Sequence, residues 1–210
     1  MENIKNKIFY TKGKKMHTKA SEEYVEVELF YADDVWKGWI PIEYRRTGTS
    51  IKNEKELEEY LIQVYDFLKP DKFEKWLNEQ NRFWKEEKKG ATTTKTFYDG
   101  LIDGGWKSGW KCTKCQLPRN NNFARRIQDL KEYGYTIATD IKRYCSTCKK
   151  NVSHLMLIPL PRNGISGNGY EIWSPKLRKK IIKTLKSIDV YENSYRTHVL
   201  PDHKFPEIRW

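Results

Sequence analysis

The sequence predicts an α+β fold, with strands and helices in separate stretches of the chain. Three observations predict it. Residues 24–31 alternate apolar and acidic side chains, as in a half-exposed strand, and residues 37–46 suggest a second strand. Apolar residues then recur at helical spacing between residues 54 and 90. A third helix and two more strands accompany two cysteine pairs, so we expect three regions, 1–90, 91–160 and 161–210.

The first region is expected to contain an edge strand and two helices. Pro41 confines the strand 37–46 to an edge, because proline cannot donate a ladder hydrogen bond. Asn53 is a predicted N-cap, with Glu56 at the third helical position. Asp71 caps the second helix, which ends at Gly90. The inward faces are Leu57, Leu61, Val64 and Leu68, then Phe73, Leu77, Gln80 and Trp84. We interpret both faces as core packing, without identifiable chemistry.

The second region begins with residues 91–94, which we interpret as a linker-like break. A helix capped by Asn121 or Asn122 follows and ends at Gly134. Its predicted inward face is Phe123, Ile127 and Leu130, which leaves Arg125, Gln128, Asp129 and Glu132 facing mostly outward and Arg126 near the flank. Strands are expected at 135–139 and 153–160. A basic helix at 177–186 follows in the third region, with Ser174 as its cap and Pro175 at its first position.

The charge of the chain lies in its second half. The 210 residues have a net charge of +12, yet residues 1–100 hold 19 Lys and Arg against 19 Asp and Glu. Residues 101–210 hold 21 against 9. Clustered cations favour a polyanionic partner such as nucleic acid, because phosphates are collected along its backbone. The alternative is a basic surface that serves solubility.

Neither membrane insertion nor export is predicted. No apolar run approaches the ~20 residues that a membrane-spanning helix needs. The amino-terminal residues lack the apolar core of a signal peptide, so we expect a cytoplasmic protein. Disulfides seldom persist in that compartment.

Four cysteines form two Cys-x-x-Cys pairs, Cys112 with Cys115 and Cys145 with Cys148, separated by 29 residues. Each spacing places two sulfurs on one tight turn, and two such turns can surround Zn²⁺ with four thiolates. Redox-active or inert thiols are the alternatives, but a redox role needs only one pair. We expect structural zinc, because four thiolates leave no coordination position open for a substrate.

The helix between the cysteine pairs, with the strand after it, resembles the second helix and wing of a winged-helix module. The pattern is Arg125-Arg-Ile-x-x-Leu-x-x-x-Gly-Tyr-x-Ile137. Arg and Gln side chains pair well with guanine and adenine edges in a major groove. Candidate contacts to double-stranded DNA are therefore Arg125, Arg126, Gln128 and Lys131. The alternative is a solvated basic helix face.

Residues from about 97 to 210 resemble a zinc-containing HNH, or ββα-metal, type II restriction endonuclease. The resemblance rests on Trp110-Lys-Cys-Thr-Lys-Cys115, on residues 122–139, and above all on Leu200-Pro-Asp-His-Lys-Phe-Pro-Glu-Ile-Arg-Trp210. It implies a hydrolase of restriction-modification systems that cuts phosphodiester bonds of duplex DNA at a short sequence. Such enzymes are frequently dimers, so a homodimer stays open.

The resemblance also implies roles for the carboxyl-terminal residues. His203 would act as general base on the attacking water, since imidazole accepts a proton near neutral pH. Asp202 would hold Mg²⁺ or a similar ion, which stabilises charge on the phosphate and the leaving oxygen. Arg196, Lys204 and Arg209 would add electrostatic stabilisation and contact DNA.

The family pattern continues with a second strand and a helix that supply an Asn and another metal ligand. The sequence stops at Trp210, so the expected element is an incomplete HNH site in a truncated nuclease, inactive or very weak by itself. The main alternative is a non-enzymatic zinc-dependent DNA-binding protein. An RNA-binding protein is a third interpretation, because the many Trp and Tyr residues can stack on bases.

Overall fold

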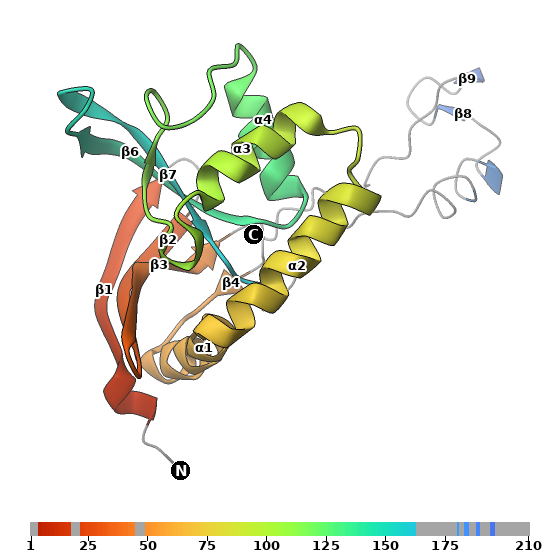
Figure 1. Ribbon diagram of the computed structural model, residues 1–210. Helices are drawn as coiled ribbons and strands as arrows, with labels where there is room; N and C mark the ends of the chain where they lie inside the picture. Colours follow the sequence, from red (N-terminus) through yellow and green to blue (C-terminus); the bar gives the residue numbers. More distant parts are fainter. Residues whose placement is uncertain are drawn as a thin grey trace. The chain divides into compact units, whose positions relative to one another are not determined.

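A computed structural model describes residues 4–17, 22–44 and 49–162, together with residues 180, 183–184, 188–189 and 194–195. The chain divides into two compact units, Met1–Asn168 and Gly169–Trp210. Almost all of the described structure lies in the first unit, whose helices and strands are labelled in Figure 1. Helices and strands are mixed in this unit, in agreement with the predicted α+β class.

Four antiparallel strands form the first sheet, in the order β1-β2-β3-β4. Their bounds are Ile8–His17, Glu22–Tyr31, Asp34–Tyr44 and Thr49–Ser50, after a 3-10 helix η1 at Ile4–Lys7. Strands β2 and β3 confirm the two strands expected from the sequence. The sheet order places β3 between β2 and β4, so the edge position expected from Pro41 is only partly correct. Within the described part of the chain, β4 pairs with Glu43 and Tyr44 and does not extend to Pro41.

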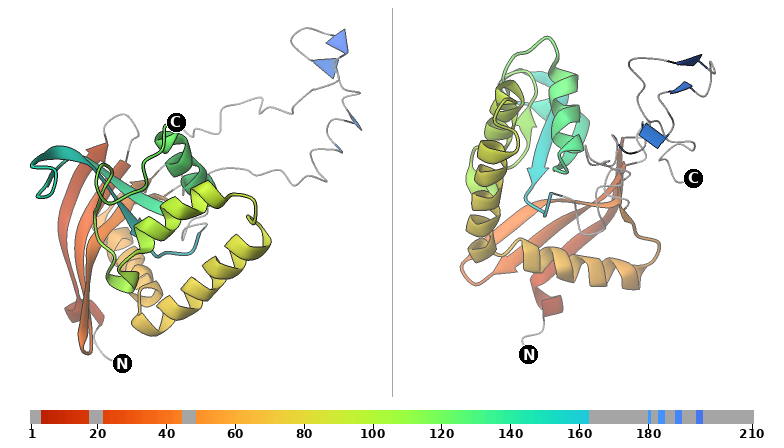
Figure 2. Two further views of the ribbon diagram at one scale, coloured as in Figure 1. Left: turned by 45° about the horizontal axis from the view of Figure 1, so that its top comes forward. Right: turned by 90° about the vertical axis from the view of Figure 1, so that its right-hand side faces the viewer.

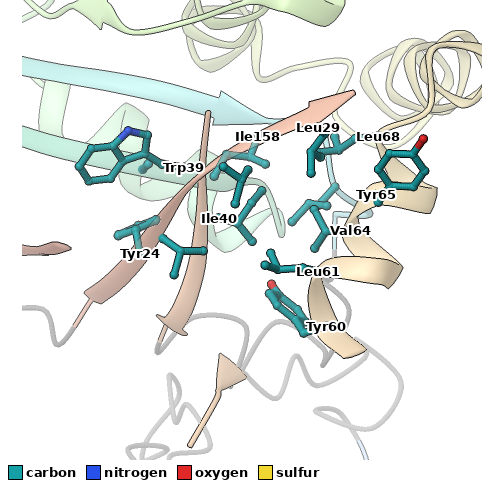
Figure 3. Close-up of a cluster of buried hydrophobic side chains, with 14 of the residues drawn as sticks. Tyr24, Leu29, Trp39, Ile40, Tyr60, Leu61, Val64, Tyr65, Leu68 and Ile158 are labelled. Atoms are coloured by element: carbon teal, nitrogen blue, oxygen red, sulfur yellow. The ribbon is translucent and has the colours of Figure 1, made fainter. Parts of the chain in front are cut away.

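Helix α1, Glu54–Phe67, begins at the predicted N-cap. The backbone N–H of Glu56 donates to Asn53 Oδ1 at 2.9 Å, while the Glu56 carboxylate accepts from Asn53 Nδ2 and from the backbone N–H of Lys52. The predicted inward residues Leu57, Leu61, Val64 and Leu68 are all buried. Figure 3 shows Leu61, Val64 and Leu68 against Leu29 and Ile40 of the first sheet.

Helix α2, Pro70–Glu86, begins two residues earlier than a cap at Asp71 requires. Lys69 is the N-cap and Pro70 occupies the first turn, where its missing N–H costs nothing. The Asp71 cap was therefore wrong, although its carboxylate still lies in the first turn, where the helix dipole favours it. The buried face consists of Trp76, Gln80, Phe83 and Trp84, with Phe73 and Leu77 half-buried.

Helix α3, Thr92–Ile102, replaces the linker expected at residues 91–94. Its first turn carries Thr94, which is buried, and its later turns bury Phe97, Tyr98 and Leu101. Three threonines in a row have weak helix propensity, and tertiary packing overrides it here. The 3-10 helix η2, Gly105–Lys107, then leads toward the first cysteine pair.

The second sheet has the order β5-β7-β6 and is antiparallel. Its strands are Lys111–Cys112, Lys150–Ile158 and Thr136–Cys145, and helix α4, Phe123–Glu132, directly precedes β6. Gly134 ends the helix as predicted, at φ 90°. The N–H groups of Gly134 and Tyr135 donate to the carbonyls of Lys131 and Leu130, which is the Schellman arrangement.

The β6–β7 hairpin separates two cores, and Figure 2 shows it between the first sheet and helices α2 to α4. Met156 and Ile158 pack with α1 and the first sheet, whereas Leu155 and Leu157 pack with the three helices. Successive residues of a strand point to opposite faces, so one strand serves both cores. The second core joins α2 to α3 and α4, so the expected boundary between residues 90 and 91 falls inside a packed cluster.

The second unit is described at few positions. Residues 180, 183 and 184 are helical and lie inside the basic helix expected at 177–186. Strand β8, Ile188–Asp189, pairs with β9, Ser194–Tyr195. The candidate residues Arg196, Asp202, His203, Lys204 and Arg209 lie outside the described residues.

Candidate metal centre and basic hairpin

The second sheet brings the two cysteine pairs together. Strand β5 ends at Cys112, which lies opposite His154 of β7, and Cys115 follows in the next turn. Strand β6 ends at Cys145, and Cys148 lies in the turn that leads into β7. Because β5 and β6 flank the same central strand, β7, their cysteine-bearing ends meet beside its start.

The four sulfur atoms have the spacing of a tetrahedral zinc site. All four lie within 4.8 Å of one another. The Sγ atoms of Cys112 and Cys148 are 3.8 Å apart, and those of Cys115 and Cys145 are 3.6 Å apart. A Zn–S bond of about 2.3 Å gives sulfur–sulfur edges of about 3.8 Å in a regular tetrahedron. The predicted cluster of four cysteines is therefore confirmed, and its donor set fits a structural zinc ion.

Local hydrogen bonds hold both cysteine turns in shape. The N–H of Lys114 donates to Cys112 Sγ, and that of Cys148 donates to Cys145 Sγ, each at 3.4 Å. Thr113 is anchored on β7, because its N–H and its hydroxyl both donate to the carbonyl of Ser153. Hydrogen bonds of this kind orient the cysteine side chains, and the N–H groups that point at sulfur offset its negative charge.

The cysteine environments differ in their acidity. The backbone N–H of Cys148 lowers the pKa of the Cys145 thiol to about 6. Desolvation, with hydrogen bonds to neighbouring thiols, raises the pKa of Cys115 to about 12. Neighbouring thiolates repel one another, and a divalent cation removes that repulsion. Metal binding at this cluster must therefore release protons.

Comparison with protein-family models, with curated proteins and with solved structures finds no match for this chain. Among the described residues, no helix is both long enough and apolar enough to cross a bilayer.

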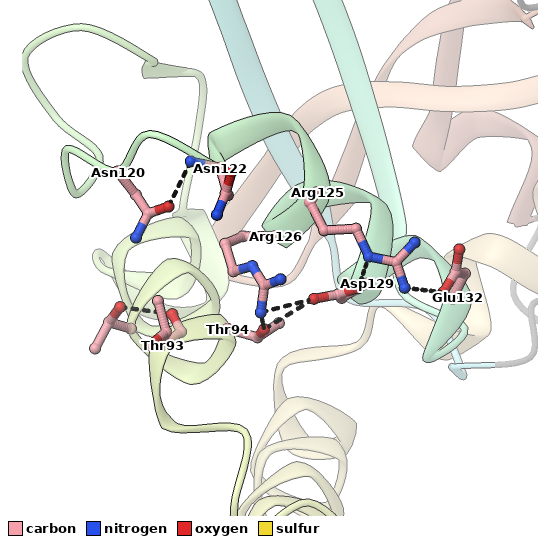
Figure 4. Close-up of polar contacts among 9 residues, drawn as sticks. Thr93, Thr94, Asn120, Asn122, Arg125, Arg126, Asp129 and Glu132 are labelled. Carbon is pink, nitrogen blue, oxygen red and sulfur yellow. Dashed lines mark hydrogen bonds and ion pairs between the residues drawn. The ribbon is translucent and has the colours of Figure 1, made fainter.

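Helix α4 carries the two arginines predicted to contact DNA, and both are engaged with acidic residues of the same helix (Figure 4). Arg125 Nε lies 2.8 Å from Asp129, and its Nη2 lies 3.5 Å from Glu132. Arg126 Nη1 lies 3.1 Å from the other oxygen of Asp129 and 3.2 Å from the Thr94 hydroxyl.

Asp129 was expected to face outward, and the structure shows that this expectation was wrong. Its carboxylate is buried and also accepts a hydrogen bond from Thr94 of α3. The predicted apolar face of α4 packs inward, with Ile127 and Leu130 buried, but α3 covers a neighbouring face as well. Figure 4 shows Asp129 with Thr94 and Arg126 on one side and Arg125 on the other.

Gln128 and Lys131 also have partners inside the protein. Gln128 Nε2 donates to Glu132 at 2.9 Å. Lys131 Nζ donates to Glu22 Oε1 at 3.2 Å, and the two side chains are only 11% and 5% exposed. All four candidate DNA contacts of α4 are thus held by intramolecular interactions.

The lysines near the cysteines fall into two groups. Lys107 pairs with Asp34, and Lys111 pairs with Asp103 at 3.5 Å. By contrast, Lys114, Lys149 and Lys150 are exposed beside the cluster, as is Lys142 on β6. Sequence reasoning had not singled out Lys142 or the exposed Tyr144. The signal was available, because residues 141–151 contain four cations and no Asp or Glu.

Proposed function

We propose that this chain binds duplex DNA through its zinc-stabilised second sheet. The observation that carries the proposal is the four-cysteine cluster. It joins two segments of the chain that are rich in Lys and Arg and contain no Asp or Glu. Residues 104–122 and 141–151 each contain four Lys and Arg and no Asp or Glu. Clustered cations on a rigid support displace counterions from a phosphate backbone, which supplies most of the non-specific affinity for DNA.

A winged-helix-like arrangement of this region is supported by its connectivity. Along the chain, the short strand β5, helix α4 and the two-stranded β6–β7 hairpin follow one another, as a strand, a helix and a wing would. In the sheet, β7 lies between β5 and β6. The zinc cluster would then stand at the tip of the wing. A cytoplasmic location suits this site, because a reducing compartment keeps cysteines available as metal ligands.

The second proposed function is DNA cleavage of the HNH restriction type. Its support is the sequence around Asp202 and His203, together with the zinc cluster and the basic second half. His203 would accept a proton from the attacking water, and Asp202 would hold a divalent cation such as Mg²⁺. A homodimer would allow both strands of the duplex to be cut.

Two measurements on the 210-residue chain test these proposals. Binding of a labelled duplex should weaken steeply between about 50 and 200 mM salt, and an affinity indifferent to salt would defeat the phosphate-contact argument. Because the HNH element is expected to be incomplete, plasmid DNA incubated with Mg²⁺ or Mn²⁺ should be nicked only slowly by the unmodified chain, and it should be spared by His203→Ala. Equal nicking by both proteins would assign the cleavage to a contaminant, and no nicking by either would leave the non-enzymatic DNA-binding protein.

A further inference from the structure

The cations of helix α4 are poorly available to an external partner. Arg125 and Arg126 share the carboxylate of Asp129, and Lys131 is buried against Glu22. A phosphate would have to displace these carboxylates, and in the last case would leave Glu22 buried without its partner. Removing one member of a buried ion pair is strongly unfavourable. Most of the positive charge on helix α4 is therefore already paired with carboxylates of the protein.

The hairpin between β6 and β7 has the opposite character. We name residues 141–151 the zinc hairpin, because it carries Cys145 and Cys148. Its lysines Lys142, Lys149 and Lys150 are exposed, and no side-chain partner is found for them among the described residues. Lys114 and Arg119, from the first cysteine turn and the segment after it, are exposed in the same way. Asp140, at the base of the hairpin, is already paired with Arg143 at 3.7 Å.

These cations are more numerous than is needed to neutralise the negative charge of a zinc ion bound by four thiolates. Four thiolates around Zn²⁺ carry a formal charge of about −2, which two neighbouring cations would balance. Five exposed cations lie within four residues of a cysteine along the chain, namely Lys114, Arg119, Lys142, Lys149 and Lys150. A net positive surface remains after the zinc site has been neutralised.

The zinc hairpin also presents apolar side chains beside its lysines. Tyr144 is 62% exposed and Ile141 is 46% exposed. The register of β6 against β7 shifts between Asp140 and Arg143, so Ile141 and Lys142 form a bulge. A bulge increases the local twist and redirects side chains outward. Exposed rings and aliphatic groups between cations suit the bases and sugars that lie between phosphates.

The geometry points to the zinc hairpin, rather than helix α4, as the element that contacts duplex DNA. This inference rests on the proposed DNA-binding function and says which surface performs it. A two-stranded ribbon fits the major groove, and the metal would fix the turn at its tip, which carries Cys145 and Cys148, before binding. Pre-organisation lowers the entropy lost when the hairpin meets its partner.

The test compares two triple variants with equal net charge, measured by fluorescence anisotropy on a short labelled duplex. The hairpin variant is Lys142→Gln/Lys149→Gln/Lys150→Gln. The matched control is Lys75→Gln/Lys85→Gln/Lys89→Gln, which removes three exposed lysines on and just after α2. The hairpin variant should lose about tenfold or more in affinity, and its slope of log affinity against log salt should flatten by about 2.7. The control should bind within about twofold of the unmodified chain.

A third variant, Arg125→Gln, asks whether the helix contributes. It should leave DNA affinity nearly unchanged if Arg125 is occupied by its ion pairs with Asp129 and Glu132 and does not contact DNA. Tyr144→Ser should weaken binding without changing the salt slope, because the tyrosine carries no charge. Zinc content and circular dichroism of each variant should match the unmodified chain, so that a lost fold is not mistaken for a lost contact.

The outcomes separate the two proposals. If the unmodified chain binds no DNA, the proposed function fails, and the hairpin inference fails with it. If the chain binds but the hairpin variant behaves like its control, or Arg125→Gln causes the larger loss, the function stands and the hairpin inference is overturned. Tighter binding of single-stranded RNA than of duplex DNA would also overturn the assigned partner.

Discussion

Lys131 and Glu22, 109 residues apart in the sequence, form a buried ion pair with 3.2 Å between Nζ and Oε1. Glu22 is also held by the Tyr24 hydroxyl, which donates to its other oxygen at 3.1 Å. The Lys131 ammonium lies over the Tyr44 ring, 5.6 Å from its centre. The pair joins helix α4 to the start of β2, and so links the part of the chain that carries the four cysteines to the first sheet.

Replacing Lys131 by Met should lower the free energy of unfolding by about 3 kcal/mol, because it leaves a buried carboxylate without its cation. Urea denaturation measures the change. The matched control is Lys95→Met, which breaks the exposed pair with Asp99 and should cost less than about 1 kcal/mol. In the double variant Glu22→Leu/Lys131→Met, part of the loss should be recovered. If Lys131→Met and Lys95→Met lower the free energy of unfolding equally, the buried pair stabilises the protein no more than the exposed one.

Replacing Gly38 by Ala should destabilise the protein by about 1–3 kcal/mol through overpacking. A Cβ at this position would overlap the Met156 methyl group and the buried Trp36 ring. Strands β3 and β7 approach each other there without room for a side chain. The control is Gly90→Ala, where nothing lies within 4 Å of the new methyl group. Thermal unfolding should separate the two variants, and a neutral Gly38→Ala would mean that the two sheets can move apart at no cost.

The purified protein should contain close to one zinc ion per chain, and a chelator should lower its melting temperature by several degrees. Cys145→Ser should lose most of the metal, since three thiolates hold the ion less tightly. Ser146→Ala changes the next residue, which is exposed, and should keep it. Metal retention should also fail as the pH falls, because thiol protons compete with the ion. Metal analysis well below half an ion per chain would defeat the four-thiolate assignment.

Alkaline pH should destabilise the protein through its buried tyrosines. Desolvation by burial raises the pKa of Tyr24, Tyr60 and Tyr98 above that of an exposed tyrosine. Below the unfolded pKa of about 10, both states are protonated and the full stability is present. Above it, only the unfolded chain releases these protons, so stability falls as pH rises.

Thermal unfolding across alkaline pH, with absorbance of phenolate as a second signal, measures this effect. Phenolate from the buried tyrosines should develop together with unfolding and not before it. Tyr98→Phe should reduce the alkaline loss at little cost near neutral pH, because this buried hydroxyl has no hydrogen-bond partner among the described residues. Full ionisation of every tyrosine in the folded protein would contradict the prediction.

Local patterns in the sequence were sufficient for most of the helices and strands. The cap at Asn53, the apolar face of α1 and the glycine stop at Gly134 depend on neighbouring residues alone, and all three are confirmed. The Cys-x-x-Cys spacings likewise predicted a four-sulfur cluster. Strand β1 was not predicted, because its lysines hide any alternation. The threonines that begin α3 were interpreted as a break, since packing against α4 is invisible in a local pattern.

The sequence by itself therefore determined the secondary structure of most segments, the four-cysteine cluster and the excess of positive charge in the second half. Only the tertiary structure decided which cations are free. Lys131 and Lys142 are the same residue type and stand eleven positions apart, yet one is buried against Glu22 and the other is exposed on a bulge. The reason is physical: an ion pair depends on distance in space, and the partner of Lys131 comes from a strand more than a hundred residues earlier.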